Sequence, residues 1–165
     1  MRSFTRSLQS GTRHLIAALL VGALWVGGVK GFSADVAVVV PPDVPVDNLS
    51  LEEVRKIFLG DRQYWSSKLR VTLLIRAPVA PERDVVLKTI YQMTEAQFRQ
   101  YWISKVFRAE VSSGPKIFYS TDMATELVAN IPGSIAFVDA SRVPRGAKVL
   151  RINGVLPGEA RYPLR

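Results

Sequence analysis

The chain has 165 residues, with 22 Lys and Arg against 14 Asp and Glu, which gives a formal charge of +8. This length suits one domain with a short extension and excludes a large multidomain enzyme. The content of 48% hydrophobic and 22% charged residues excludes a disordered chain, and the absence of Cys excludes disulfides, zinc–thiolate sites and a cysteine nucleophile.

The first 34 residues have the order of charge and hydropathy of a secretory signal peptide. Residues 1–14 contain three arginines and no acid, and residues 15–29 form an uncharged apolar run. Small residues follow at Ser33 and Ala34, which predicts cleavage near Ala34 and a periplasmic or secreted protein. A bilayer span needs about 20 apolar residues, so this shorter run favours a cleaved signal over the alternative, an uncleaved membrane anchor.

Half of the net positive charge of the chain lies in this same segment. It holds four of the 22 basic residues and none of the acidic ones, so the predicted domain at residues 35–165 carries a net charge of only +4. In that part both signs are interspersed, whereas nucleic-acid binding requires a dense basic stripe. We therefore expect no nucleic-acid partner, and membrane contact only through the signal peptide.

The part of the chain after the signal peptide is expected to begin with a buried strand. The β-branched run at residues 35–40 stops at two prolines, as strands do. Ser50 and Glu53 can then form a capping box, which opens a helix that ends at Gly60. Residues 69–76 are predicted to be a second buried strand.

Two helices and a turn come next. Residues 82–93 show the apolar spacing of a helix, and Thr94 with Gln97 forms a second capping box that opens another helix. Residues 112–115 (SSGP) are predicted to be a turn. The inner face of the second helix is expected to contain Phe98, Tyr101, Trp102 and Val106.

The rest of the chain continues the alternation of strands and helices. Residues 116–119 are predicted to form a short strand, and Ser120 or Thr121 is predicted to cap the following helix. Residues 134–138 and 147–152 are predicted strands, and the tail after them is expected to be loosely held. Strands separated by helices indicate an α/β domain with a central sheet flanked by helices.

The residues needed for common catalytic sites are missing or have a simpler explanation. The only His is His14, inside the signal peptide, so no histidine of the domain can act as a base or metal ligand. Ser104 and Lys105 lie on a predicted amphipathic helix, where a solvated face explains them. We expect no enzyme, no metal site and no cofactor, and a hydrolase with two convergent carboxylates is the enzymatic alternative. The carboxylate pairs lie in predicted first helical turns, where the helix dipole favours negative charge: Glu52, Glu53, Glu82 and Asp84.

Aromatic residues recur within the amphipathic elements. A stacking platform for sugars or bases would need them exposed together on one surface, whereas their spacing favours packing in the core. The residues concerned are Phe58, Trp65, Tyr101, Trp102, Phe107 and Phe137.

Three segments resemble one protein family. Residues 49–65, with LSLEEV, IFLG and Trp65, resemble the segment L-s-x-e-e-l-x-x-I-F-l-G-x-x-x-x-W of phosphate-type periplasmic substrate-binding proteins of ABC transporters. Residues 126–138 (ELVANIPGSIAFV) resemble that family's V-x-x-x-P-G-a-I-G-Y-v segment, and residues 98–107 are similar to a helix of its short, single-lobe members. The resemblance covers about residues 36–150 and implies a single lobe of the type 2 periplasmic-binding-protein fold.

This resemblance implies where an anion would bind. Arg76 ends the strand that leads into the family's anion-binding loop, and the helix start at Ser120 and Thr121 offers N–H groups for capture of an oxyanion such as phosphate. In the place of the family's Ser-Gly-Thr clamp the chain has residues 80–82 (APE), which offer no hydroxyl and add a negative charge. For Arg76, a surface charge at a strand end is the alternative interpretation.

These observations predict an exported solute-binding protein for an oxyanion, most simply phosphate, with an ABC importer or a sensor in the membrane as a partner. The alternative is a protein-interaction module that keeps the lobe without ligand binding, and the altered clamp favours this alternative. The two hypotheses differ in whether Arg76 and residues 120–122 face a common cleft.

Overall fold

The computed structural model describes residues 35–165, so the predicted signal peptide at residues 1–34 lies outside the described residues. None of the helices in the described part is long and apolar enough to cross a membrane. The helices are α1 (Leu51–Phe58), α2 (Pro81–Val86), the π-helical segment η1 (Leu87–Tyr91), α3 (Glu95–Phe107), α4 (Thr121–Asn130) and the short 3-10 helix η2 (Ala140–Arg142). The strands are β1 (Val36–Val40), β2 (Asn48–Leu49), β3 (Tyr64–Ser66), β4 (Leu69–Arg70), β5 (Thr72–Arg76), β6 (Lys116–Phe118), β7 (Ser134–Asp139), β8 (Lys148–Val149) and β9 (Arg151–Ile152).

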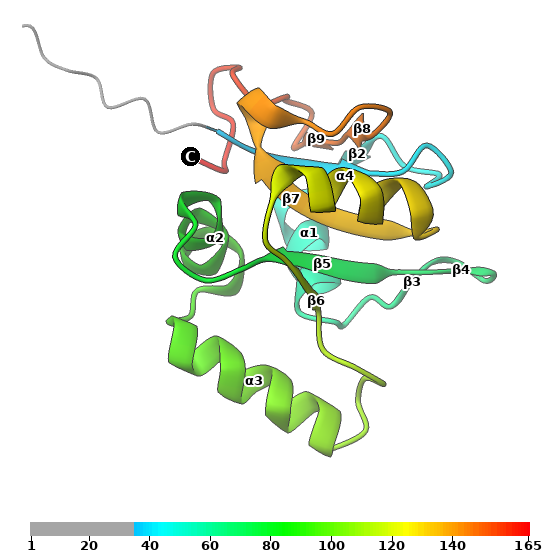
Figure 1. The fold of residues 1–165 in the computed structure, drawn as a ribbon, viewed down its shortest axis with the longest axis vertical. Coiled ribbons are helices and arrows are strands. Elements are labelled where there is room, and N and C mark those ends of the chain that lie inside the picture. The colour runs from blue at the N-terminus through cyan, green and yellow to red at the C-terminus, as the bar shows by residue number, and fades with distance from the viewer. Residues whose placement is uncertain (1–34) are drawn as a thin grey trace, which may run out of the picture. The chain divides into compact units, whose positions relative to one another are not determined.

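A five-stranded sheet in the order β6-β5-β7-β1-β8 forms the centre of the domain (Figure 1). Strand β5 is parallel to both of its neighbours, β6 and β7, whereas β1 is antiparallel to β7 and to β8. Two short pairs lie outside this sheet, β2 beside β9 and β3 beside β4. The parallel strands end together on one side, which we call the carboxyl end of the sheet, and they begin together at its amino end.

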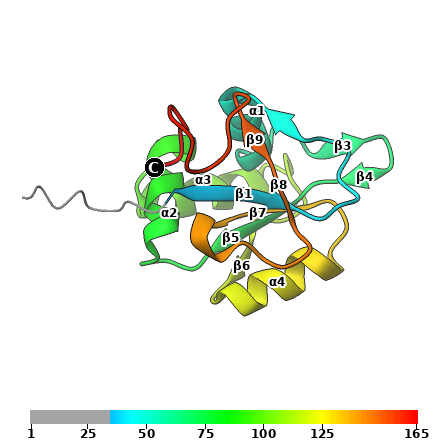
Figure 2. The ribbon, with the colours of Figure 1, turned by 90° about the horizontal axis from the view of Figure 1, so that it is seen from above.

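Helices cover both faces of the sheet (Figure 2). Helix α4 covers one face, while α1 and α2 lie on the other. Successive residues of β5 point to opposite faces, so Leu74 belongs to the hydrophobic cluster with Phe118 and Val128, and Ile75 belongs to the cluster with Phe58. The structure therefore has the predicted α/β architecture, a central sheet flanked by helices.

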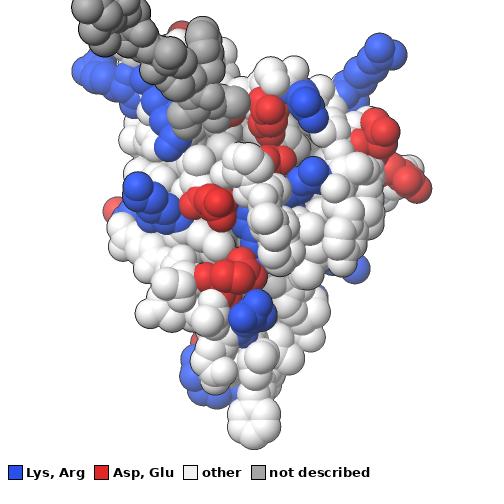
Figure 3. Space-filling view, turned by 60° about the vertical axis from the view of Figure 1, so that its left-hand side comes forward, with Lys and Arg blue, Asp and Glu red and all other residues white. Residues whose placement is uncertain are grey.

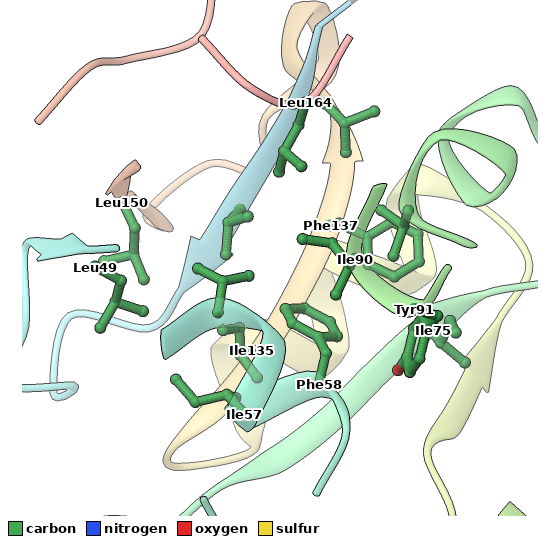
Figure 4. Close-up of a cluster of buried hydrophobic side chains, with 14 of the residues drawn as sticks. Leu49, Ile57, Phe58, Ile75, Ile90, Tyr91, Ile135, Phe137, Leu150 and Leu164 are labelled. Carbon is green, nitrogen blue, oxygen red and sulfur yellow. The ribbon is translucent and has the colours of Figure 1, made fainter. Parts of the chain in front are cut away.

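The larger hydrophobic cluster lies between the sheet and α1 (Figure 4). Phe58 on α1 packs against Phe137 on β7 and against Tyr91 on η1, with ring centroids 5.8 and 6.3 Å apart. Tyr91 meets Phe98 of α3 edge to face at 4.8 Å. Because burial of one such side chain contributes about 1.5–3 kcal/mol, this chain of rings ties α1, η1 and α3 to the sheet.

The helix starts follow the sequence signals. The Glu53 N–H donates to the Ser50 hydroxyl and the Ser50 N–H donates to the Glu53 carboxylate, so the first predicted capping box is confirmed. The hydrogen bonds from Ser50 lower the pKa of Glu53. Thr94 and Gln97 form the second predicted capping box. Of the two candidates for the cap of α4, Ser120 is the residue whose hydroxyl caps the helix.

Three predicted elements are interrupted. The predicted strand at residues 69–76 is divided into β4 and β5 at Val71, because the chain pairs first with β3 and then with β6 and β7. The predicted helix at 82–93 is α2 followed by η1, which ends at Gln92 in the left-handed conformation (φ 54°). Apolar spacings of three and four residues suit α- and π-helical turns alike, so the pattern cannot separate them. The predicted strand at 147–152 is likewise divided into β8 and β9.

The expectation of a loosely held tail is wrong. Tyr162 and Leu164 are buried, and the Tyr162 hydroxyl donates to the Val36 carbonyl at 2.8 Å. The Val36 N–H donates in turn to the Leu164 carbonyl at 2.9 Å. Burial raises the pKa of the Tyr162 phenol. The tail is docked on the start of β1, a contact between distant segments that no local sequence pattern predicts.

Candidate functional site

The three predicted site residues all lie at the carboxyl end of the sheet. Arg76 is the last residue of β5 and is paired in register with Phe118, the last residue of β6. The Ala77 N–H extends this pairing by donating to the Phe118 carbonyl at 2.8 Å. Ser120 and Thr121 follow two and three residues later, at the start of α4. The parallel pairing of β5 with β6 therefore brings the predicted residues to one end of the sheet.

The charge of Arg76 already has a partner within the domain. Its Nε atom lies 3.2 Å from a carboxylate oxygen of Glu82, and only 21% and 17% of these two side chains are exposed. The guanidinium group also lies over the ring of Phe118, 5.7 Å from its centroid. The Nη1 atom of Arg76 is buried without a hydrogen-bond partner in the described part of the chain. A buried donor in this state requires a water or a ligand oxygen.

A second arginine, Arg83, fixes the backbone at the same place. It is 2% exposed and donates two hydrogen bonds of 2.8 Å to the carboxylate of Glu95. It also donates to the carbonyl of Arg76 and lies over the ring of Phe98. The sequence analysis missed this residue, because a charged residue in the first turn of a helix usually faces solvent. Arg83 orients the end of β5, on which Arg76 stands.

The start of α4 has hydrogen-bond donors that would attract an anion and a carboxylate that would repel it. The Ser120 hydroxyl accepts a hydrogen bond from the Met123 N–H at 3.1 Å, which leaves its own proton for another acceptor. The N–H groups of the first helical turn have no acceptor within the helix. Asp122 in the same turn places a negative charge beside them. The neighbouring loop contains Val79, which is 92% exposed and has a φ of 73°, a strained conformation for a β-branched residue.

Two interpretations of α3 are corrected by the structure. Lys105 is buried rather than solvated, and its ammonium group donates to the Leu59 carbonyl and to Asp61. Burial lowers the pKa of Lys105, but its hydrogen bonds with Asp61 and Tyr101 outweigh burial, so the pKa is raised. Phe107 was expected in the core and Val106 on the inner face, but they are 90% and 41% exposed. The buried residues of α3 are Phe98, Trp102 and Lys105, and their spacing from Phe107 places it on the opposite side of the helix.

The other predicted core aromatics are buried or half-buried. Four of them are less than 9% exposed, and Tyr101 is half-buried with its hydroxyl donating to the Leu59 carbonyl at 2.7 Å. No group of three or more His, Cys, Asp or Glu that could hold a metal ion occurs among residues 35–165. The fully buried members of the aromatic set are Phe58 and Phe137, and Trp65 and Trp102 are each 6% exposed.

A basic cavity that the sequence analysis missed lies at the amino end of the sheet. It includes Arg70, Lys116 and residues 112–114, which belong to the predicted turn at residues 112–115. Its cationic residues are far apart in the sequence and stand on different elements, so no motif signals their convergence. The cavity is separate from the predicted site, because Arg70 precedes β5 and Arg76 ends it.

No protein-family profile and no curated protein matches this sequence. The fold is similar to that of an ABC-type phosphate transport receptor from Vibrio cholerae, with a TM-score of 0.59 and 17% identity over 74% of this chain and 48% of the receptor. A putative phosphate ABC transporter substrate-binding protein with bound phosphate from Clostridium perfringens has a TM-score of 0.59 and 16% identity over 74% and 46% of the two chains. PstS from Borrelia burgdorferi has a TM-score of 0.58 and 14% identity over 74% and 49%. The chain thus spans about half the length of these proteins, and the likeness shows the fold, that of one lobe.

Proposed function

We propose that this chain is an exported, single-lobe solute-binding protein for a small oxyanion such as phosphate, and that it works with an ABC importer or a sensor in the membrane. The observation that supports the proposal is the pairing of Arg76, at the end of β5, with Phe118, two residues before the Ser120 cap of α4. The fold neighbours of this lobe include a protein with bound phosphate. Export to the periplasm is proposed from the signal-like sequence at residues 1–34.

The anion is held by the positive charge of Arg76 and by hydrogen bonds from backbone N–H groups and a hydroxyl group. The Arg76 guanidinium turns from Glu82 to the anion, with which it forms charge-assisted hydrogen bonds. The first N–H groups of α4, beginning with Thr121, donate to the anion from a helix end that favours negative charge. The Ser120 hydroxyl donates a hydrogen bond to the anion as a third contact. A single lobe leaves the anion half solvated, so tight binding requires a partner or a second copy as the other wall.

The test is isothermal titration of the chain with inorganic phosphate at low salt, with sulfate as a second anion. We expect saturable heat that is lost in Arg76→Gln. In Glu82→Gln the affinity is expected to rise about fivefold, because the internal competitor for the guanidinium is removed. Arg145→Gln is the matched control, since this arginine is exposed in the turn before β8. Heat that is lost in Arg70→Gln and retained in Arg76→Gln would place phosphate at the amino end and contradict the proposal.

A protein-interaction module is the second candidate. It is favoured by the ion pair between Arg76 and Glu82, which neutralises the predicted ligand-binding charge. The exposed apolar residues Val79 and Tyr119, 92% and 69% exposed, flank the same end of the sheet. If neither the cooperatively folded wild type nor Glu82→Gln gives heat with phosphate or sulfate, this second function replaces the first.

A further inference from the structure

The cavity at the amino end of the sheet is lined by cations and by no acid. Its volume is about 160 Å³, and its charged lining residues are Arg62, Arg70 and Lys116. The loop at residues 112–114 supplies two serine residues and a glycine to the wall. Pockets for drug-sized ligands run to about 300–1,000 Å³, so this cavity suits a single small anionic group.

Two of the three cations of this cavity are positioned by neighbouring side chains, and the set has little counter-charge. Arg70 donates to the Ser112 hydroxyl at 2.5 Å, and Arg62 lies over the ring of Trp65 at 5.6 Å. The carboxylate paired with Arg62 belongs to Glu53 and is 3.8 Å away. Within residues 35–165, Arg70 and Lys116 form no ion pair. Like charges that converge without a partner favour the binding of an anion.

An apolar surface continues directly from this cavity. It lies on the last two turns of α3, where Ile103, Val106 and Phe107 are 62%, 41% and 90% exposed. With Trp102 and Gly114 they line an open depression, and these two residues also line the basic cavity. Figure 1 shows α3 at the lower end of the domain, and the lowest tip in Figure 3 carries uncharged side chains, below a face with interspersed charges.

We infer that this combined surface binds an anionic lipid, with the head-group phosphate in the basic cavity and an acyl chain on the apolar surface of α3. Basic groups beside exposed aliphatic and aromatic side chains are the arrangement by which proteins attach to anionic lipids. An extended peptide fits this depression less well, because its backbone needs hydrogen-bond partners and the lining side chains are apolar except for the Trp102 indole. This inference does not depend on the proposed function, which uses the opposite end of the sheet.

The experiment is a titration of the full chain with dihexanoyl phosphatidylglycerol below its micelle concentration, followed by nuclear magnetic resonance. The signals of the Trp102 indole and the Gly114 amide report on the cavity and the apolar surface together, so binding to other parts of the chain does not interfere. We expect both signals to shift and saturate. Dihexanoyl phosphatidylcholine, with the same chains and no net charge, should bind at least about fivefold more weakly. Inorganic phosphate should bind at least about tenfold more weakly, because it buries no apolar surface.

Exposed side chains allow variants that do not endanger the fold. Arg70→Gln and Lys116→Gln should each weaken lipid binding about fivefold. Phe107→Ser should weaken it about tenfold, through the lost burial of one aromatic side chain. Arg145→Gln and Tyr119→Ser are the matched controls, an exposed arginine and an exposed tyrosine elsewhere, and should leave the affinity unchanged.

Four outcomes would overturn the inference. Equal affinity for the two lipids would mean that the cavity does not recognise charge, and equal affinity for the lipid and phosphate would mean that α3 is not used. Unchanged affinity in Arg70→Gln, Lys116→Gln and Phe107→Ser would place the lipid elsewhere. Shifts of the same two signals with an acidic, leucine-rich peptide and none with phosphatidylglycerol would assign the surface to a protein partner.

Discussion

The two ends of the parallel strands both gather basic residues, but the chain uses them differently. At the carboxyl end, Arg76 and Arg83 are mostly buried and each forms an ion pair with a carboxylate of the domain. At the amino end, Arg70 and Lys116 line a cavity without an acidic side chain. The number of cations at a strand end therefore does not by itself indicate a binding site. What matters is whether the fold has already supplied a partner for each charge.

The largest expected effect on stability comes from removing a cation at the carboxyl end of the sheet. Arg83→Met removes the buried partner of an ion pair with Glu95, whose side chain is 31% exposed, and it also removes the donor to the Arg76 carbonyl. It should reduce the free energy of unfolding by about 3–4 kcal/mol. Arg70→Gln, at the amino end, should change it by less than about 0.5 kcal/mol, because that side chain is exposed. Urea unfolding of both variants at pH 7 measures their free energies of unfolding. Equal losses in the two variants would abolish the distinction between the two ends.

The backbone at Arg70 passes very close to Gly133. Gly133 has a φ of 66°, and a Cβ added there would lie 2.2 Å from the Arg70 carbonyl oxygen. Gly133→Ala should therefore cost about 3 kcal/mol, through both backbone strain and displacement of the strand. Gly154 has a φ of 81° with nothing near its Cβ position, so Gly154→Ala carries the strain alone and should cost about 1 kcal/mol. Similar melting temperatures for the two variants would show that the close approach to Arg70 is unimportant.

The same contrast explains what the sequence could predict. Features encoded within a few residues were predicted correctly, such as the two capping boxes and a cap of α4 at Ser120 or Thr121, of which Ser120 is the cap. The fold class followed from the alternation of strands and helices. Features that depend on distant partners were not predicted, since the docking of the tail on Val36 joins segments more than a hundred residues apart.

The same limit holds for the candidate site and for the charged residues around it. The sequence placed Arg76 at a strand end, but its ion pair with Glu82 depends on how α2 turns back over β5. Lys105 was expected on a solvated helix face. Helical periodicity alone cannot show that Asp61 and the Leu59 carbonyl, from another element, accept hydrogen bonds from its ammonium group. The basic cavity combines residues from four separate segments, and only the folded chain brings them together.

Lys105 on α3 allows a test of another structural cation. Its pKa is raised above the usual 10.5, with burial opposed by stronger hydrogen bonds to Asp61 and Tyr101. A raised pKa in the folded state means that the stabilisation is present below about pH 10.5 and is lost as the pH rises through the folded-state pKa. Lys105→Met should cost about 1.5 kcal/mol at pH 8. The difference from wild type should shrink at pH 11, measured by urea unfolding at both pH values, and a constant difference would contradict this account.

The smallest expected effect on stability concerns backbone strain at the carboxyl end of the sheet. Val79 has a φ of 73° and is 92% exposed, so its side chain contributes little packing while its backbone is unfavourable for a β-branched residue. Val79→Asn should raise the free energy of unfolding by about 1 kcal/mol, because Asn adopts this conformation at lower cost. Thermal unfolding measures this increase in stability. The control is Val85→Asn, because Val85 has a normal helical conformation and its replacement should not increase stability. If Val79→Asn also weakens phosphate binding, the strain serves the ligand site; if binding is unchanged, the strained loop belongs to the fold alone.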